Sequence, residues 1–136
     1  MSKILIVDDD ALLVRMYQKK LTNDGYDVST AGDGIAALKK LETDIPDLVL
    51  LDIMMPGMNG LEVLKKIKAN EKTKKLPVIM LTNVGGSDED TERGLELGAV
   101  AYLIKAGTRP DAVVSKIKEV LAGYVREIPK VKAADD

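Results

Sequence analysis

The sequence predicts an α/β domain in which helices cover both faces of a doubly wound parallel sheet of five strands. Four short apolar runs and one more polar strand-like segment recur along the chain, and a segment with helical character follows each of them. Strands buried on both faces have nearly continuous apolar sequences, as is typical of parallel sheets between helix layers. Because the connections between the runs are short, the alternation favours a single α/β domain.

The five predicted strands cover residues 3–7, 26–30, 47–51, 77–81 and 100–104. Residues typical of helix ends mark the helices between them. The first helix, over about residues 11–23, ends at Gly25. The second is opened by Asp33 and ends before Pro46, and the third follows a turn-rich segment and ends near Ala69.

The last two helices each begin with a capping-box pattern, in which side chains bond to free backbone N–H groups of the first turn. The pairs are Ser87 with Asp90 and Thr108 with Asp111. Gly98 ends the fourth helix, and the fifth continues to about Gly123. Residues 124–136 carry no strong pattern, so we expect one domain over residues 1–123 followed by a tail or linker stub.

The composition excludes several functions. The 136 residues include 20 basic and 22 acidic ones, for a net charge of −2, so nothing indicates a nucleic-acid or membrane partner. The absence of Cys and His excludes disulfides, thiolate chemistry and the most common general base. With no Trp or Phe and four Tyr, stacking on bases is not expected. No apolar stretch approaches a membrane span and the N-terminus leads directly into a strand, so we expect a cytoplasmic protein.

Four of the five predicted strands end in polar side chains that suit phosphoryl chemistry. Asp8 and Asp9 follow the first strand, Asp52 the third, Thr82 the fourth and Lys105 the fifth. Ligands of parallel α/β sheets bind beyond the carboxyl ends of the strands, so these side chains are expected to converge. Three carboxylates, a hydroxyl and an amine suit a magnesium ion and a phosphoryl group.

The second strand has no such residue at its tip, and this favours one strand order. The order 2-1-3-4-5 places that strand at an edge and keeps the other four side by side. The alternative order 3-2-1-4-5 would place Asp52 at the edge, two strands from Asp8 and Asp9. The chemistry therefore favours the first order.

Clustering the carboxylates has an electrostatic cost that a cation would relieve. At about 4 Å, each pair repels by roughly 1 kcal/mol in water and about 4 kcal/mol at an effective dielectric of 20. Oxygen-only ligands fit magnesium better than zinc or copper. Once Asp52 accepts the phosphoryl group, Lys105 can pair with one of its oxygens and Thr82 can donate a hydrogen bond to another.

These motifs together resemble the receiver domain of bacterial response regulators, over about residues 3–122. The segments that carry the resemblance are Val7-Asp8-Asp9, the run Leu51-Asp52-Ile53-Met54-Met55-Pro56-Gly57-Met58-Asn59-Gly60, Thr82, Tyr102 and Lys105. The resemblance implies a flavodoxin-like fold with Asp52 as phosphoacceptor. It further implies that Asp9 is a direct Mg²⁺ ligand, that Asp8 acts in the outer shell, and that the backbone carbonyl of Met54 completes the protein ligands.

The resemblance also implies a signalling switch that catalyses only its own phosphoryl transfer and dephosphorylation. Thr82 and Tyr102 would be the switch pair, and the output face would be the fourth helix, fifth strand and fifth helix, around Glu92, Tyr102 and Lys116. The implied donor is the phosphohistidine of a sensor histidine kinase or phosphotransfer protein, or a small acyl phosphate. A downstream protein target is implied, and we expect a monomer or a weak phosphorylation-dependent dimer.

Two departures from the family pattern, and two apolar residues at positions that flank the hydrolytic water path in the family, affect the site. Receivers usually have a cis proline after the lysine, whereas Ala106 follows Lys105; because a non-proline cis bond costs about 2.5–4 kcal/mol, we expect a trans bond. Asn83, after the switch hydroxyl, is larger than the family's usual residue and would narrow the donor's approach. Since Met54 and Val84, beside the path of the hydrolytic water, are both apolar, we expect slow self-dephosphorylation.

Two other readings remain open. Asp8 and Asp10 have the Asp-x-Asp spacing of haloacid dehalogenase-type phosphatases, but that class needs Thr or Val in place of Leu12 and a further acidic motif. Asp10 is instead expected to cap the following helix. The second hypothesis is a phosphorylation-independent interaction module on the same fold. It remains open because Asn83 and Ala106 differ from the usual family residues.

Overall fold

The computed structural model of the protein describes residues 2–82, 88–105 and 109–123, without the side chains of residues 88–91. Its five strands form one parallel sheet in the order β2-β1-β3-β4-β5, which confirms the predicted order. The strands are β1 (Lys3–Val7), β2 (Asp27–Ala31), β3 (Leu48–Asp52), β4 (Val78–Thr82) and β5 (Ala101–Ile104).

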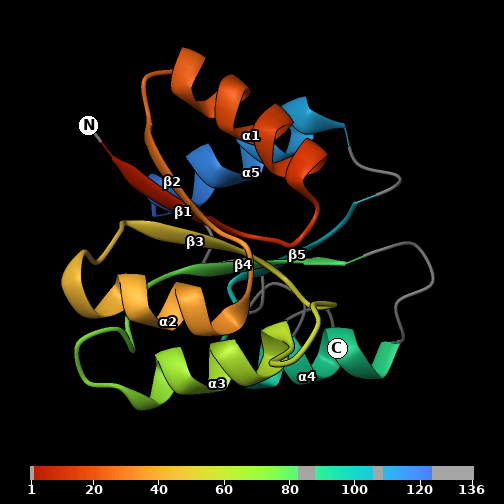
Figure 1. Ribbon diagram of the computed structural model, residues 1–136. Helices are drawn as coiled ribbons and strands as arrows, with labels where there is room; N and C mark the ends of the chain where they lie inside the picture. The colour runs from red at the N-terminus through yellow and green to blue at the C-terminus, as the bar shows by residue number, and fades with distance from the viewer. Residues whose placement is uncertain (1, 83–87, 106–108, 124–136) are drawn as a thin grey trace.

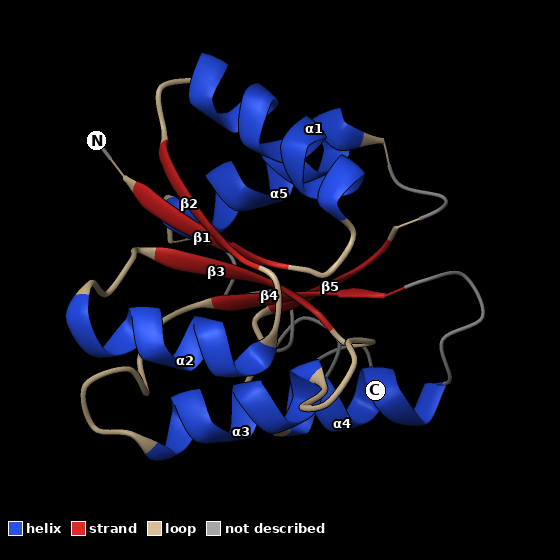
Figure 2. Cartoon of the chain, in the orientation of Figure 1, coloured by secondary structure: helices blue, strands red, loops and turns tan. Residues whose placement is uncertain are grey.

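Helices cover both faces of this sheet, as predicted. They are α1 (Ala11–Asn23), α2 (Gly34–Thr43), α3 (Gly60–Ala69), α4 (Asp88–Glu96) and α5 (Pro110–Leu121). Helices α1 and α5 lie on one face and α2, α3 and α4 on the other (Figure 1; Figure 2 shows the strands in red between the helices). The apolar side chains between the sheet and the first pair are called the α1–α5 layer, and those on the opposite face the α2–α4 layer.

Three strands lie one residue later than the apolar pattern predicts, and β5 is one residue shorter at its start. The ladder of backbone hydrogen bonds includes the polar residues at the strand ends, because the Ile53 N–H donates to Leu81 O (2.9 Å) and the Lys105 N–H to Thr82 O (2.6 Å). Asp52 and Thr82 are therefore the last residues of β3 and β4, and the strand hydrogen bonds fix the position of their backbone.

Side-chain caps at the starts of α1 and α2 hold the loops that precede these helices at the carboxyl edge of the sheet. The Asp10 carboxylate accepts from the Leu13 N–H (3.2 Å) and so caps α1 as expected; Asp33 caps α2 in the same way. The predicted capping box of α5 is wrong, because the N-cap is Arg109 and Pro110 occupies the first helical turn. Thr108, Ser87 and the Asp90 side chain lie outside the described residues.

The core consists of the two layers. Strands β3 and β4 are buried throughout, and β1 is buried from its second residue onward, which explains their uninterrupted apolar sequences. None of the described helices combines the length and the apolar character needed to span a membrane.

Candidate functional site

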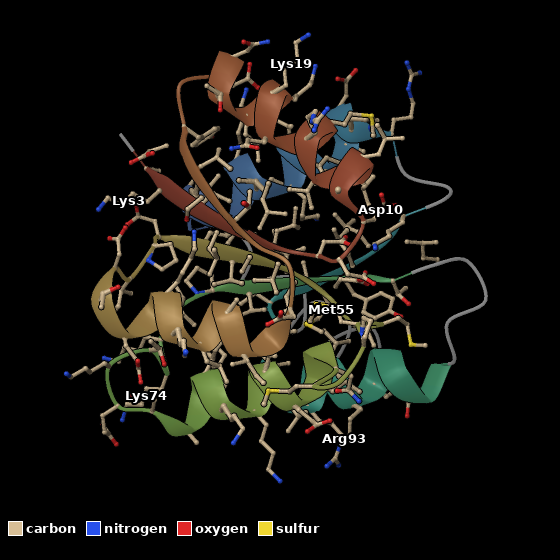
Figure 3. The ribbon with its side chains drawn as sticks, in the orientation of Figure 1. Lys3, Asp10, Lys19, Met55, Lys74 and Arg93 are labelled. Atoms are coloured by element: carbon tan, nitrogen blue, oxygen red, sulfur yellow. The ribbon has the colours of Figure 1, made fainter. Side chains whose placement is uncertain are left out.

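The site lies at the carboxyl edge of the sheet, where three charged side chains share the face covered by α1 and α5. They are Asp8, Asp52 and Lys105, and each stands two residues after a side chain of the α1–α5 layer. Side chains two residues apart along a strand share a face of the sheet, so alternation alone aligns them. Figure 3 labels Asp10 and Met55 at this edge and Lys3 at the opposite end of β1.

The Lys105 ammonium joins the two buried carboxylates. Its Nζ lies 2.7 Å from Asp8 Oδ2 and 3.1 Å from Asp52 Oδ2. The Lys105 side chain is 10% exposed and the two carboxylate side chains are 1% exposed, so the group is nearly dehydrated. Charges in such surroundings interact more strongly than on a surface, because water screens them less.

Burial and charge shift the ionisation of this group. Burial raises the pKa of Asp52 to about 6, and the negative charge of Asp8 adds to the rise. The Lys105 ammonium and the Met54 N–H oppose it. Burial acts to lower the pKa of Lys105, but Asp8 and Asp52 together outweigh burial, and the net shift is upward. The ammonium is therefore held in its charged form between the two acids.

Asp9 completes a cluster of three acids that could hold a divalent cation. Carboxylate oxygens of Asp8, Asp9 and Asp52 all lie within 4.8 Å of one another, and Asp9 is exposed. Asp8 Oδ1 accepts from the Asp10 N–H (2.9 Å). Asp8 Oδ2 is close to Lys105 Nζ, yet it has no aligned hydrogen bond with any described residue. An all-oxygen cluster of this size fits a hard cation and its bound water.

The loop after β3 holds the Asp52 carboxylate through a backbone hydrogen bond. The Met54 N–H donates to Asp52 Oδ1 (3.2 Å), while the Met54 side chain is 60% exposed beside the site. A Cβ on Gly60 would lie 2.1 Å from the backbone oxygen of Asp52, so α3 starts against the end of β3 at a distance that only glycine permits. Asn59 caps α3 by accepting from the Glu62 N–H (3.0 Å). The close approach of Gly60 is visible only in three dimensions.

Thr82 and Tyr102 belong to the other face of the sheet. Thr82 is buried, and it pairs in register with Ile104, two residues beyond Tyr102, so the two side chains share a face on neighbouring strands. Tyr102 packs against the α2–α4 layer, and its hydroxyl is buried without a hydrogen-bond partner among the described residues. The predicted switch pair thus lies on one face of neighbouring strands, offset by two residues in register, and this face is opposite the Lys105 side chain.

Three residues of the predicted site follow β4 and β5. Asn83, Val84 and Ala106 lie outside the described residues, so the trans bond after Lys105 stays a prediction. One buried polar residue of the α1–α5 layer, Tyr17 of α1, has no counterpart in the sequence-based predictions. Its helical spacing from Leu13 and Leu21 indicates an inward position, although spacing alone does not connect it to the charged group.

The chain matches a known protein family over most of its length. The family model described as the response regulator receiver domain matches residues 4–118. The alkaline phosphatase synthesis transcriptional regulatory protein PhoP of Bacillus subtilis is 43% identical over 121 residues, which cover 88% of this chain and 48% of that protein. The response regulator PleD of Caulobacter vibrioides is 45% identical over 104 residues, 76% of this chain and 23% of that protein. The chain thus spans about half or less of the length of these relatives.

Solved structures resemble the chain over nearly their whole length. A CheY-like response regulator receiver domain protein from Methanospirillum hungatei superposes with a TM-score of 0.84 at 34% identity, covering 93% of this chain and 98% of the other. The chemotaxis protein CheY4 of Vibrio cholerae gives 0.82 at 32% identity, with 88% and 98% covered. The Mn²⁺-bound form of the response regulator Rcp1 gives 0.77 at 30% identity, with 88% and 93% covered.

Proposed function

Since this chain belongs to the receiver-domain family of two-component response regulators, we propose that it is a switch in which Asp52 accepts a phosphoryl group. The observation that carries the proposal is the Lys105 ammonium, which lies between the buried carboxylates of Asp8 and Asp52. A buried cation beside a nucleophilic carboxylate stabilises both the carboxylate and the anion that it becomes.

Two features of the chain prepare Asp52 for attack on phosphorus. The Met54 N–H holds Oδ1, and Oδ2 faces Lys105. In the proposed step, a carboxylate oxygen of Asp52 forms a bond to phosphorus, and the bond from phosphorus to the donor nitrogen or acyl oxygen breaks. Lys105 then pairs with the added charge, and the Thr82 hydroxyl donates to a phosphoryl oxygen.

The acids of the site suit Mg²⁺. Asp9, Asp52 and the Met54 carbonyl would hold the ion, with Asp8 in the outer shell. The carboxylate oxygens of the three acids, which lie within 4.8 Å of one another, support the acidic part of this assignment. When bound, the ion supplies charge neutralisation for the approaching anion.

A phosphorylated switch needs a phosphoryl donor and a protein target. We propose a sensor histidine kinase or phosphotransfer protein as donor and a protein target for the face of α4, β5 and α5 around Glu92, Tyr102 and Lys116. Thr82 and Tyr102 would couple this face to phosphorylation by shifting a pre-existing equilibrium. We also propose that residues 1–123 form the receiver domain, that residues 124–136 are a tail or linker stub, and that the protein is cytoplasmic.

Intact-mass measurement after incubation with Mg²⁺ and acetyl phosphate tests the proposal. Wild type should gain one phosphoryl group and Asp52→Ala none. Asp10→Asn is a matched control, because it removes a neighbouring acid while Asn still caps a helix. The Asp10→Asn variant should react like wild type. If neither acetyl phosphate nor phosphoramidate gives an adduct with wild type, the covalent switch is refuted and the phosphorylation-independent interaction module is favoured.

A further inference from the structure

Lys68, in the last turn of α3, has a side chain that is held along its length. Its Nζ donates to the backbone oxygens of Leu76 (2.7 Å) and Lys74 (3.2 Å) in the loop that leads to β4. Its stem packs against Gly98, just beyond α4, where an added Cβ would lie 3.2–3.4 Å from the Lys68 Cε, Cγ and Cδ atoms. The amine is therefore fixed where the ends of α3 and α4 meet, at the amino edge of the sheet.

The partners of the Lys68 amine carry no charge. Both are backbone carbonyls, and Lys68 forms no ion pair with a described acid. Burial lowers the pKa of Lys68, whereas hydrogen-bonded acids raise the pKa of Lys3 and Lys20. A lysine that is partly withdrawn from water, without a carboxylate partner, holds its extra proton less tightly than a lysine on the surface.

The number of acceptors around the Lys68 amine suits its neutral form. An ammonium has three N–H donors, whereas a neutral amine has two and a lone pair. The two carbonyls satisfy both N–H groups of the neutral amine, and the lone pair then points away from them. Because the Lys68 side chain is only partly buried, a small reagent can reach that lone pair.

From this geometry we propose that Lys68 is an acylation site, which accepts the acyl group of a small acyl phosphate. The neutral Nζ attacks the acyl carbon and a C–N bond forms. The bond from that carbon to the phosphate oxygen breaks, phosphate leaves with the electron pair, and Nζ loses a proton to solvent. The inference goes beyond the proposed function, because the same class of reagent would supply a phosphoryl group to Asp52 and an acyl group to Lys68.

Acylation would change the contact between α3 and α4. The product amide is uncharged and keeps a single N–H donor, so one of the two carbonyls loses its hydrogen bond. The bond to Lys74 O is the longer one and is the one expected to break. The acyl group also adds bulk beside Gly98, at the end of a helix of the proposed output face. Lys68 would thus act on α4 from the edge of the sheet opposite Asp52.

Peptide mapping by mass spectrometry after incubation with acetyl phosphate tests the proposal. Cleavage after glutamate gives one peptide, residues 63–71, that contains Lys65, Lys66 and Lys68. Lys65 and Lys66 are matched controls, because both are exposed and neither forms an ion pair with a described acid. We expect Lys68 to be acetylated at least about threefold faster than either control, as for an amine activated by desolvation. Acetylation of Lys68 no faster than that of both controls would overturn the proposal.

Two further measurements connect this preference to the fold and separate it from phosphorylation. In concentrated urea the three lysines should react alike, and a preference for Lys68 that persists there would refute the structural argument. Asp52→Ala should keep the wild-type preference, because Lys68 lies at the opposite edge of the sheet, and its loss would contradict the proposal. A wild type that accepts no phosphoryl group would refute the proposed function, while the acetylation rates would still decide the role of Lys68.

Discussion

Gly60→Ala is the substitution for which the structure gives the sharpest expectation. The added Cβ would lie 2.1 Å from the backbone oxygen of Asp52 and 2.8 Å from the Cα of Ile53, so backbone must move. The movement weakens the hydrogen bond from the Gly60 N–H to Ile53 O (2.8 Å), at a cost of about 1 kcal/mol. Overpacking adds about 1–3 kcal/mol. The better helix propensity of Ala returns at most about 1 kcal/mol, which leaves a net loss of roughly 2 kcal/mol.

Urea unfolding followed by circular dichroism measures this loss. With a slope of about 2 kcal/mol per molar, the midpoint should fall by roughly 1 M. Gly57→Ala and Gly32→Ala are matched controls, because a Cβ at either position would meet nothing within 4 Å. Gly57 has φ +76°, so its substitution should cost about 1 kcal/mol from backbone strain alone. Gly32→Ala should stay within about 0.5 kcal/mol of wild type. A Gly60→Ala midpoint no lower than that of Gly32→Ala would refute the steric argument.

Three further substitutions have defined outcomes. Lys105→Met should slow phosphorylation of Asp52 by about tenfold or more, since the buried cation beside the nucleophile is lost; an intact-mass time course showing the wild-type rate would contradict this. Tyr102→Phe should raise the free energy of unfolding by about 1 kcal/mol, because it removes a buried hydroxyl without a described partner; a lower urea midpoint would count against that account. Met54→Gln should shorten the lifetime of phosphorylated Asp52 by about threefold or more, since an exposed polar side chain there can orient water, and an unchanged decay of the adduct mass would exclude a role for this position.

The convergence of Asp8, Asp52 and Lys105 could be predicted because it depends on topology. Apolar runs specify buried parallel strands, and the carboxyl ends of such strands meet at one edge whatever the details of packing. The strand order could also be predicted, because placing β2, which has no carboxylate or lysine at its end, at the edge of the sheet keeps the other four strands side by side. The first helix matched its predicted bounds because the Asp10 cap and Gly25 both act locally.

Other features depend on tertiary contacts that no local pattern encodes. The extra ladder bond that makes Thr82 a strand residue requires Lys105, far away in the sequence. The need for glycine at position 60 comes from the backbone of Asp52, which approaches it only after folding. Tyr17 looks like any inward residue of an amphipathic helix, and the effect of the Lys105 and Asp8 charges on its pKa arises only after folding.

The division of the site between the two faces of the sheet bears on how a phosphoryl group would be sensed. The charged group lies on the α1–α5 side, whereas Thr82 and Tyr102 lie on the α2–α4 side. The ends of β4 and β5 connect the two sides, because the Lys105 N–H donates to Thr82 O (2.6 Å). If Asp52 is phosphorylated as proposed, a side-chain movement of Lys105 toward it would therefore act on a backbone that is bonded to Thr82, the proposed switch residue. On the opposite face the Tyr102 hydroxyl has no hydrogen-bond partner among the described residues, so no bond to that part of the chain would oppose a small displacement of this backbone.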